Sequence, residues 1–417
     1  MFFSQDPRGP LRKIPRVTDP PEAPRDQAPP DRAAAESSYR RGQESFNRRS
    51  RESNEAAILC FRQAIEQDPT YAPAYAALAA AYCEAMIRYG HPRSLVDAAI
   101  GLTEKSVELD PGLLAGYDAL AFAHFARGDL RKSLEAQYKV HVLDAAYPDA
   151  IANIAYLHLD LGELDLAVEW NRRALAVQSP AVESPARRGL AYVCRNFGRL
   201  DLMFEEDAEA EAWLRKAVTL QPDFSSARVL LVYLHYRRGS GVRTQGEAHA
   251  LLEARPDDPE TLNYAADVAL LRGNLAEARQ LFEHAIALGP DSRNFYRARR
   301  AKTGLGFVLW QQGDPAAAQS LLDERIAIRT KEDEEGLNAW GPAYELAAIH
   351  AVLGRRPEAL TWLRRAVERG WREAHLAEID VMLQTLSGDP EYERILRDVR
   401  RQVAQMKVRA GKIGLPQ

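Results

Sequence analysis

A glycine that returns at a nearly constant interval constrains the fold of this chain more than any other feature. Seven glycines follow one another at spacings of 34 to 41 residues, and five of them have an alanine or serine five positions later, as in the pair Gly162 and Ala167. The glycines are Gly128, Gly162, Gly198, Gly239, Gly273, Gly313 and Gly354. A fixed period of this length indicates stacked copies of one supersecondary unit.

Prolines mark the second boundary of each unit. Apolar residues recur at helical spacing between glycine and proline, and proline cannot continue a helix. The boundary pairs are Asp68-Pro69, Asp110-Pro111, Ser179-Pro180, Gln221-Pro222, Arg255-Pro256 and Gly289-Pro290. The pattern predicts about nine helix pairs, which begin near residues 34, 73, 114, 148, 184, 225, 259, 293 and 340, and a terminal helix near residue 390.

This arrangement resembles the tetratricopeptide repeat, a helix-turn-helix of 34 residues. With Gly162 at the turn position of the repeat, the surrounding unit supplies the apolar and small residues of the consensus. They are Ile151, Ile154, Ala155, Ala167 and Ala174, whereas Pro180 comes one residue late and Asn171 replaces a usual aromatic. The resemblance implies an all-α fold, a right-handed α-solenoid of about nine helix pairs.

The first two units carry a narrower resemblance. The stretch from Tyr39 to Tyr75 is similar to repeat arrays of bacterial signalling proteins, in which the array follows a winged-helix domain, a protein kinase or a nucleotide cyclase. The stretch 359–399 resembles the end of such arrays. Because only 33 residues precede the first predicted helix, we expect the array without an effector domain.

The composition divides the chain into three parts. Residues 1–33 contain eight of the 24 prolines and few large apolar side chains, so they cannot bury enough surface to fold. We predict a disordered tail at 1–33, a repeat superhelix with a terminal capping helix at 34–405, and a flexible tail at 406–417.

Charge and cysteine content exclude several classes of protein. The net charge is -4, and a nucleic-acid binder would normally show a basic excess. Three cysteines, Cys60, Cys83 and Cys194, lack the paired spacing of a zinc site and are too few for a disulfide framework. No signal sequence or long apolar run is present. We therefore expect a cytoplasmic protein with reduced thiols, no membrane contact and no nucleic-acid partner.

Recognisable catalytic chemistry is missing from the sequence. The phosphate-binding, zinc-protease, nucleophile-elbow and calcium-loop motifs do not occur. Four histidines, His124, His158, His235 and His350, fall at the same repeat position, four residues before a turn glycine, which predicts packing side chains rather than metal ligands. We expect no cofactor, no metal and no enzymatic activity.

Two acidic runs interrupt the repeats. The first spans 205–211 and the second spans 331–335. Runs of like charge usually form solvated faces, and docking of a basic partner is the alternative.

An aromatic stripe is the best candidate for a binding surface. The position six residues before each turn glycine lies about 200° around the helix from a packing position, so it faces away from the packed side. In tetratricopeptide arrays this face lines the concave surface. The candidate groove residues are Phe122, Tyr156, Tyr192, Tyr233, Asp267 and Phe307. These residues either anchor a partner or fill a narrow superhelix.

Two functions fit these observations. The first is a non-enzymatic scaffold whose concave groove binds a protein or peptide partner. The second is a regulatory array that binds a small ligand or a signalling protein and controls a separately encoded effector. An enzyme with an unrecognised site is a third class.

Overall fold

The structure, a computed structural model, describes residues 30–89, 91–177, 184–288, 301–412 and 414. Its ordered elements are twenty α-helices and one short 3-10 helix, with no β-strand among the described residues. The first ten helices are α1 (Arg32–Phe46), α2 (Arg51–Gln67), α3 (Ala72–Tyr89), α4 (Ser94–Leu109), α5 (Leu114–Arg127), α6 (Leu130–Leu143), α7 (Pro148–Asp160), α8 (Leu164–Val177), α9 (Ser184–Met203) and α10 (Asp207–Leu220). The others are α11 (Ser225–Arg237), α12 (Gly241–Ala254), α13 (Pro259–Leu271), α14 (Leu275–Ala287), α15 (Ala301–Gln311), α16 (Pro315–Glu334), α17 (Trp340–Val352), α18 (Arg356–Glu368), α19 (Ala374–Ala377), η1 (Gln384–Leu386) and α20 (Pro390–Ala410).

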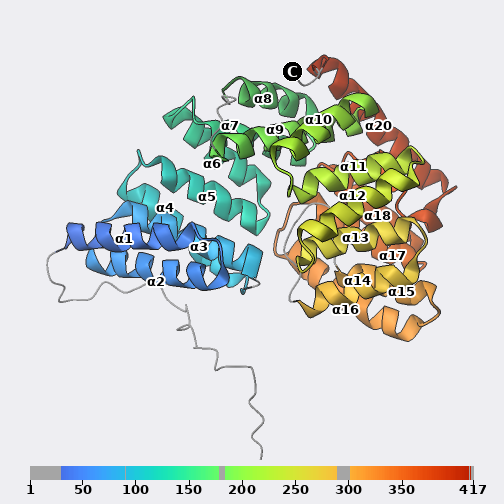
Figure 1. Cartoon of the computed structure of the whole chain (residues 1–417), viewed down its shortest axis with the longest axis horizontal. Helices are drawn as coiled ribbons and strands as arrows, with labels where there is room; N and C mark the ends of the chain where they lie inside the picture. The colour runs from blue at the N-terminus through green and yellow to red at the C-terminus, as the bar shows by residue number, and fades with distance from the viewer. Residues whose placement is uncertain (1–29, 90, 178–183, 289–300, 413, 415–417) are drawn as a thin grey trace, which may run out of the picture.

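Helices α1 to α18 pack as nine consecutive pairs, which confirms the predicted all-α solenoid. Figure 1 shows the pairs stacked side by side along a curved path. The last helix, α20, begins at residue 390 as predicted. No helix in the described part of the chain combines the length and the apolar content that crossing a membrane requires.

The turn glycines end the first helix of a pair by adopting a left-handed backbone. At Gly128 φ is +89°, the glycine amide donates to Phe125 O at 2.8 Å, and the Asp129 amide donates to His124 O at 2.8 Å. Asp129 then caps the next helix by accepting from the Lys132 amide. Six of the seven predicted turn glycines have positive φ: Gly128, Gly162, Gly239, Gly273, Gly313 and Gly354.

Gly198 is the exception, and its prediction as a turn residue is wrong. It lies inside α9, where an added Cβ would come within 2.6 Å of Leu214 Cγ. The turn of this unit falls at Glu205 (φ +59°), and Ala210 follows five residues later. Close packing between α9 and α10 therefore explains the glycine. With the turn at Glu205, the groove position of this unit belongs to Arg199.

The predicted domain boundaries also need correction. Helix α1 begins at Arg32, inside the predicted tail, and Asp31 caps it by accepting from the Ala34 amide at 3.0 Å. Residues 1–29 of that tail lie outside the described residues. At the other end, α20 continues to Ala410 rather than ending at 405, because its last turns are buried against α8: Met406 is 7% exposed.

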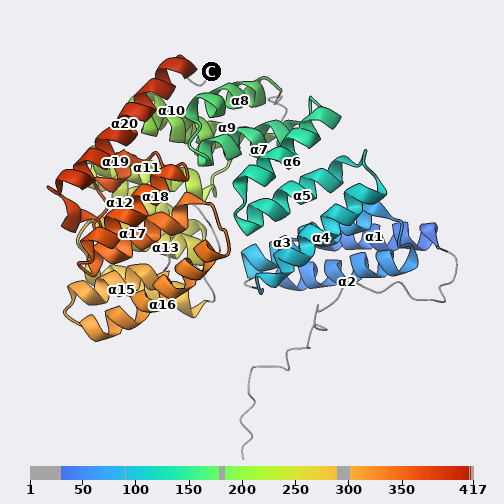
Figure 2. The ribbon, with the colours of Figure 1, turned by 180° about the vertical axis from the view of Figure 1, so that it is seen from behind.

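The buried side chains form two main cores. The first, which runs from Ala35 to Ala126, holds together α1 to α5, which we call the N-terminal lobe. The second, which runs from Leu130 to Ala410, holds together α6 to α20, which we call the closed section. In Figures 1 and 2 the red helix α20 lies beside the green helices α8 to α10, far from it in sequence.

The closed section is closed by direct contact between its two ends. The turn after α7 meets the turn after α18 so tightly that a Cβ on Gly162 or Gly370 would collide with the backbone of the other turn. Helix α20 packs on α8, where Arg172 donates to Ala410 O at 2.9 Å and Arg409 pairs with Asp165 at 2.5 Å. The array therefore returns on itself instead of remaining an open spiral.

Candidate functional site

The six predicted groove residues do not share one open face. Tyr192 is 48% exposed, and Phe122, Tyr156 and Tyr233 are half-buried. Asp267 and Phe307 are buried at 4% and 6%, so the prediction that they line an open groove is wrong. Both residues lie on the first helix of a pair, α13 and α15, and these helices pack against their neighbours in the array.

Side-chain contacts bring two of the predicted residues together through an arginine that sequence reasoning missed. The Arg195 guanidinium lies 5.1 Å from the Tyr156 ring centre and 5.8 Å from that of Tyr192. Tyr156 in turn contacts Phe125 at 6.1 Å, and Tyr192 contacts Phe224 at 4.7 Å. We call these five residues the aromatic ladder; they come from α5, α7, α9 and the residue before α11.

Arg195 is buried at the centre of this ladder, and no carboxylate of the described residues lies within ion-pair distance of it. The side chain is 8% exposed, and Nη1 donates to Asn196 Oδ1 at 2.9 Å. The Nε atom is buried and has no hydrogen-bond partner in the described part of the chain. Cation–π contact with two rings is its main compensation, and such contacts stabilise by about 0.5 to 2 kcal/mol.

A second arginine, one helical turn along α9, has the opposite environment. Arg199 is 3% exposed; Nη1 donates to Asp160 Oδ1 at 2.5 Å and Nε donates to Glu373 Oε1 at 3.1 Å. Glu373 lies just before α19, so this ion pair joins the two ends of the closed section. Burial and the charge of Asp160 raise the pKa of Tyr156 well above its usual range, which keeps that phenol neutral.

The histidines behave as packing residues, as predicted. His124, His158, His235 and His350 are all buried, and burial lowers the pKa of His124, His235 and His350. His158 contacts Glu163 through Nδ1 at 2.7 Å and Tyr138 through Nε2 at 2.8 Å. Among the described residues no group of three His, Cys, Asp or Glu side chains is placed to hold a metal ion.

Carboxylates of both acidic runs form ion pairs within the molecule. Glu206 pairs with Lys407 of α20, and Glu211 accepts from Arg215 and Arg238. In the second run Glu332 accepts from Arg329 at 2.5 Å. Because these carboxylates already have basic partners, they are poor candidates for docking a basic protein.

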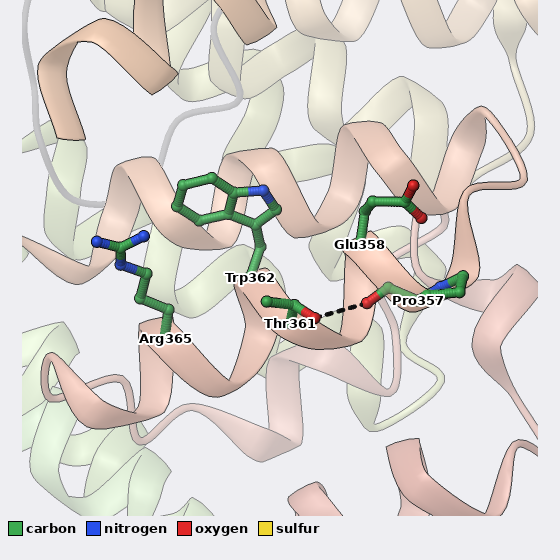
Figure 3. A pocket seen from close by; sticks show the side chains of 5 residues that line it. All are labelled: Pro357, Glu358, Thr361, Trp362 and Arg365. Atoms are coloured by element: carbon green, nitrogen blue, oxygen red, sulfur yellow. Dashed lines mark hydrogen bonds between the residues drawn. The ribbon is translucent and has the colours of Figure 1, made fainter. Parts of the chain in front are cut away.

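A shallow hollow on α18 is the other surface feature near the closure. Figure 3 shows its lining, Pro357, Glu358, Thr361, Trp362 and Arg365. Arg365 lies 5.1 Å from the Trp362 ring centre and pairs with Asp333 at 2.9 Å, while the Thr361 hydroxyl donates to Pro357 O. All five come from one helix, and Thr361 and Arg365 already have partners within the chain, so the hollow is weaker evidence for a site than the ladder.

Comparison with known proteins places the repeats in a family. Models of the tetratricopeptide repeat match residues 245–293 and residues 299–324 and 340–365. Human protein O-mannosyl-transferase TMTC3 is 25% identical over 281 residues, which are 67% of this chain. The chain spans 28% of the length of that relative.

Two solved structures are similar to this chain, and the first supports the fold. The human IFIT1 dimer with m7Gppp-AAAA has a TM-score of 0.50 at 13% identity, and the match covers 80% of this chain and 71% of that one. A tetratricopeptide repeat protein from Parabacteroides merdae has a TM-score of 0.48 at 14% identity, over 66% of this chain and 99% of that one. The chain thus carries tetratricopeptide repeats at 245–293, 299–324 and 340–365, and its paired helices with left-handed turns form a tetratricopeptide-like solenoid.

Proposed function

We propose that this protein is a non-enzymatic scaffold that binds a partner protein or peptide at the aromatic ladder. Tetratricopeptide repeats generally bind proteins or peptides, and the predicted groove residues Asp267 and Phe307 of the closed section are buried. The ladder is the part of the predicted stripe that keeps an exposed aromatic residue, Tyr192. We also propose that the array is related to those of bacterial signalling proteins and that the protein is cytoplasmic.

The observation that carries this proposal is the combination of an exposed tyrosine with an arginine held between rings. Aromatic residues and arginine are enriched at binding hot spots because they bury large area at low entropic cost. Tyr192 meets Phe224 and Arg195 on one side and solvent on the other. Such a residue contributes less to the core than a buried aromatic does, so its exposed surface is available to a partner.

The chemistry of the thiols supports the non-enzymatic part of the proposal. Burial raises the pKa of Cys83 to about 12 and that of Cys194 to about 11. Both stay protonated at neutral pH and are therefore weak nucleophiles.

Site-specific photo-crosslinking tests the proposal. Benzoylphenylalanine in place of Tyr192 should crosslink one partner in native lysate, whereas the same residue in place of Val242, which is 87% exposed on α12, should not. The purified partner should then bind Tyr192→Ala weaker by about 2 kcal/mol or more, with a nearly unchanged melting temperature. Equal crosslinking from both positions, or unchanged affinity of Tyr192→Ala, would refute the assignment.

A further inference from the structure

We infer that Arg195 is the docking point for one carboxylate, carried by an Asp or Glu side chain of the partner. The inference rests on the proposed function and adds the chemistry of the partner. It starts from a comparison among the buried arginines of the described residues, which are Arg195, Arg199, Arg325 and Arg329.

Three of these four arginines are neutralised inside the chain. Arg199 contacts Asp160 and Glu373, and both Arg325 and Arg329 contact Glu345, at 3.0 and 2.5 Å. Arg195 has no carboxylate within ion-pair distance among the described residues, and its Nε has no partner. A buried cation without an anion is costly, and a carboxylate with bidentate geometry offsets that cost.

The groups around Arg195 favour a single negative charge over a dianion. The carboxylates of Asp160 and Glu373 lie on Arg199, the next arginine of the same helix face. They oppose the accumulation of more negative charge, so a phosphate dianion should bind worse than a carboxylate. The Tyr156 phenol adds no charge, because burial and Asp160 keep it protonated.

The position of Arg195 within the ladder indicates an internal side chain rather than a chain end. Rings continue on both sides, Tyr156 and Phe125 in one direction and Tyr192 and Phe224 in the other. A partner segment that follows the ladder passes Arg195 at its middle. The Tyr192 ring lies beside the Arg195 guanidinium and is 48% exposed. Exposed side chains change rotamer in picoseconds to nanoseconds, so a rotation of Tyr192 opens access to the guanidinium.

Arginine side-chain NMR on the full-length protein tests this inference without the partner. The probes, at matched ionic strength, are sodium propionate as a Glu side-chain mimic, N-acetylglycine as a chain-end mimic, inorganic phosphate, and sodium chloride. Propionate should shift the Arg195 Nε–H signal saturably and more strongly than the other three. The Arg199 signal is the internal control and should stay in place, because its Nε is bonded to Glu373.

An Arg195 signal that does not respond, or that responds as strongly to N-acetylglycine, phosphate or chloride, overturns the inference. Propionate should also raise the melting temperature of the natural protein, because it binds the folded state. The variant Arg195→Met should fold with little loss of stability and show no such rise; a rise as large as that of the natural protein also overturns the inference. The result is separable from the proposed function. Crosslinking at residue 192 without a propionate response refutes the carboxylate and leaves the scaffold role, whereas a response without crosslinking refutes the scaffold role, and with it the partner, and leaves only the carboxylate affinity of Arg195.

Discussion

The N-terminal lobe and the closed section are built from the same kind of helix pair, but they bury their apolar faces in different ways. In the lobe, α1 to α5 bury their apolar faces between neighbours in sequence, in a core that ends at Ala126. In the closed section, contacts between the residues around Asp160 and those around Glu373 add a second layer of burial. Sequential stacking alone thus holds one region, and long-range closure holds the other.

Helix α5 of the lobe is paired with α6 of the closed section, and apart from this stacking the two regions meet at a second, small contact. Arg93 at the start of α4 lies 3.7 Å from both Glu332 and Glu335, and Leu337 packs on the Cα of Gly128. The closure, in contrast, uses touching backbones, a buried ion-pair cluster and a whole helix. Perturbing the closure should therefore destabilise the molecule far more than perturbing this second contact between lobe and closed section.

Removal of α20 should have the largest effect. Truncation after residue 389 deletes the buried side chains of Tyr392, Ile395, Leu396, Val399 and Val403. Each contributes about 1.5–3 kcal/mol, so their sum is comparable with the whole stability of a domain. Hydrogen exchange should show lost protection in α8 and α10 and retained protection in α2 and α3. Truncation after residue 412 is the control; equal loss in both regions would contradict the division.

Arg199→Met should destabilise strongly. The substitution leaves the carboxylates of Asp160 and Glu373 buried without their cation, which costs about 3–5 kcal/mol of unfolding free energy. Urea unfolding measures the loss. The matched variant Arg195→Met, on the same helix, removes a cation that has no carboxylate partner in the described residues and should cost little. Similar losses in both variants would show that the ion-pair cluster is not what stabilises the closure.

Asp201→Asn should stabilise the protein in mildly alkaline solution. Burial, together with Glu209 and Glu206, raises the pKa of Asp201 to about 8, and only Lys407 opposes this. Between about pH 4 and pH 8 the folded state holds a proton that the unfolded state has released, so stability falls as pH rises through this window. Asparagine removes that loss.

The unfolding free energy of Asp201→Asn should exceed that of the natural protein by about 1 kcal/mol or more at pH 8.5. The difference between the two proteins should shrink at pH 5, where Asp201 is protonated in the folded state. A difference that does not depend on pH would mean that Asp201 does not titrate in this range.

Arg93→Met should have the smallest effect. Half-exposed ion pairs contribute about 0–1 kcal/mol, so urea unfolding should change by less than that. Spin labels on Leu59 of α2 and Val242 of α12, both exposed, should report a broader distance distribution in the variant. A loss of several kcal/mol would show that the lobe and the closed section form one cooperative unit.

Part of the candidate site was predictable and part was not. The repeat register predicted both Tyr156 and Tyr192. For Tyr192 the register was counted from Gly198, although the turn of that unit lies at Glu205. A glycine at a tight helix crossing and a glycine in a turn look the same in sequence, and Glu205 gives no signal of a left-handed backbone. Arg195 carried no signal either, because its meaning depends on which rings lie beside it.

The sequence alone determined the helix pairs, because the forces that set them act within one unit: glycine ends the first helix, proline ends the second and apolar periodicity fixes the packed face. Only the tertiary structure decided that the array closes, that Asp267 and Phe307 are covered and that α20 is anchored on α8. Small angles between successive pairs add up along a solenoid, so contacts between residues 160 and 373 depend on every pair between them. A local sequence pattern therefore cannot predict whether the two ends of the array meet.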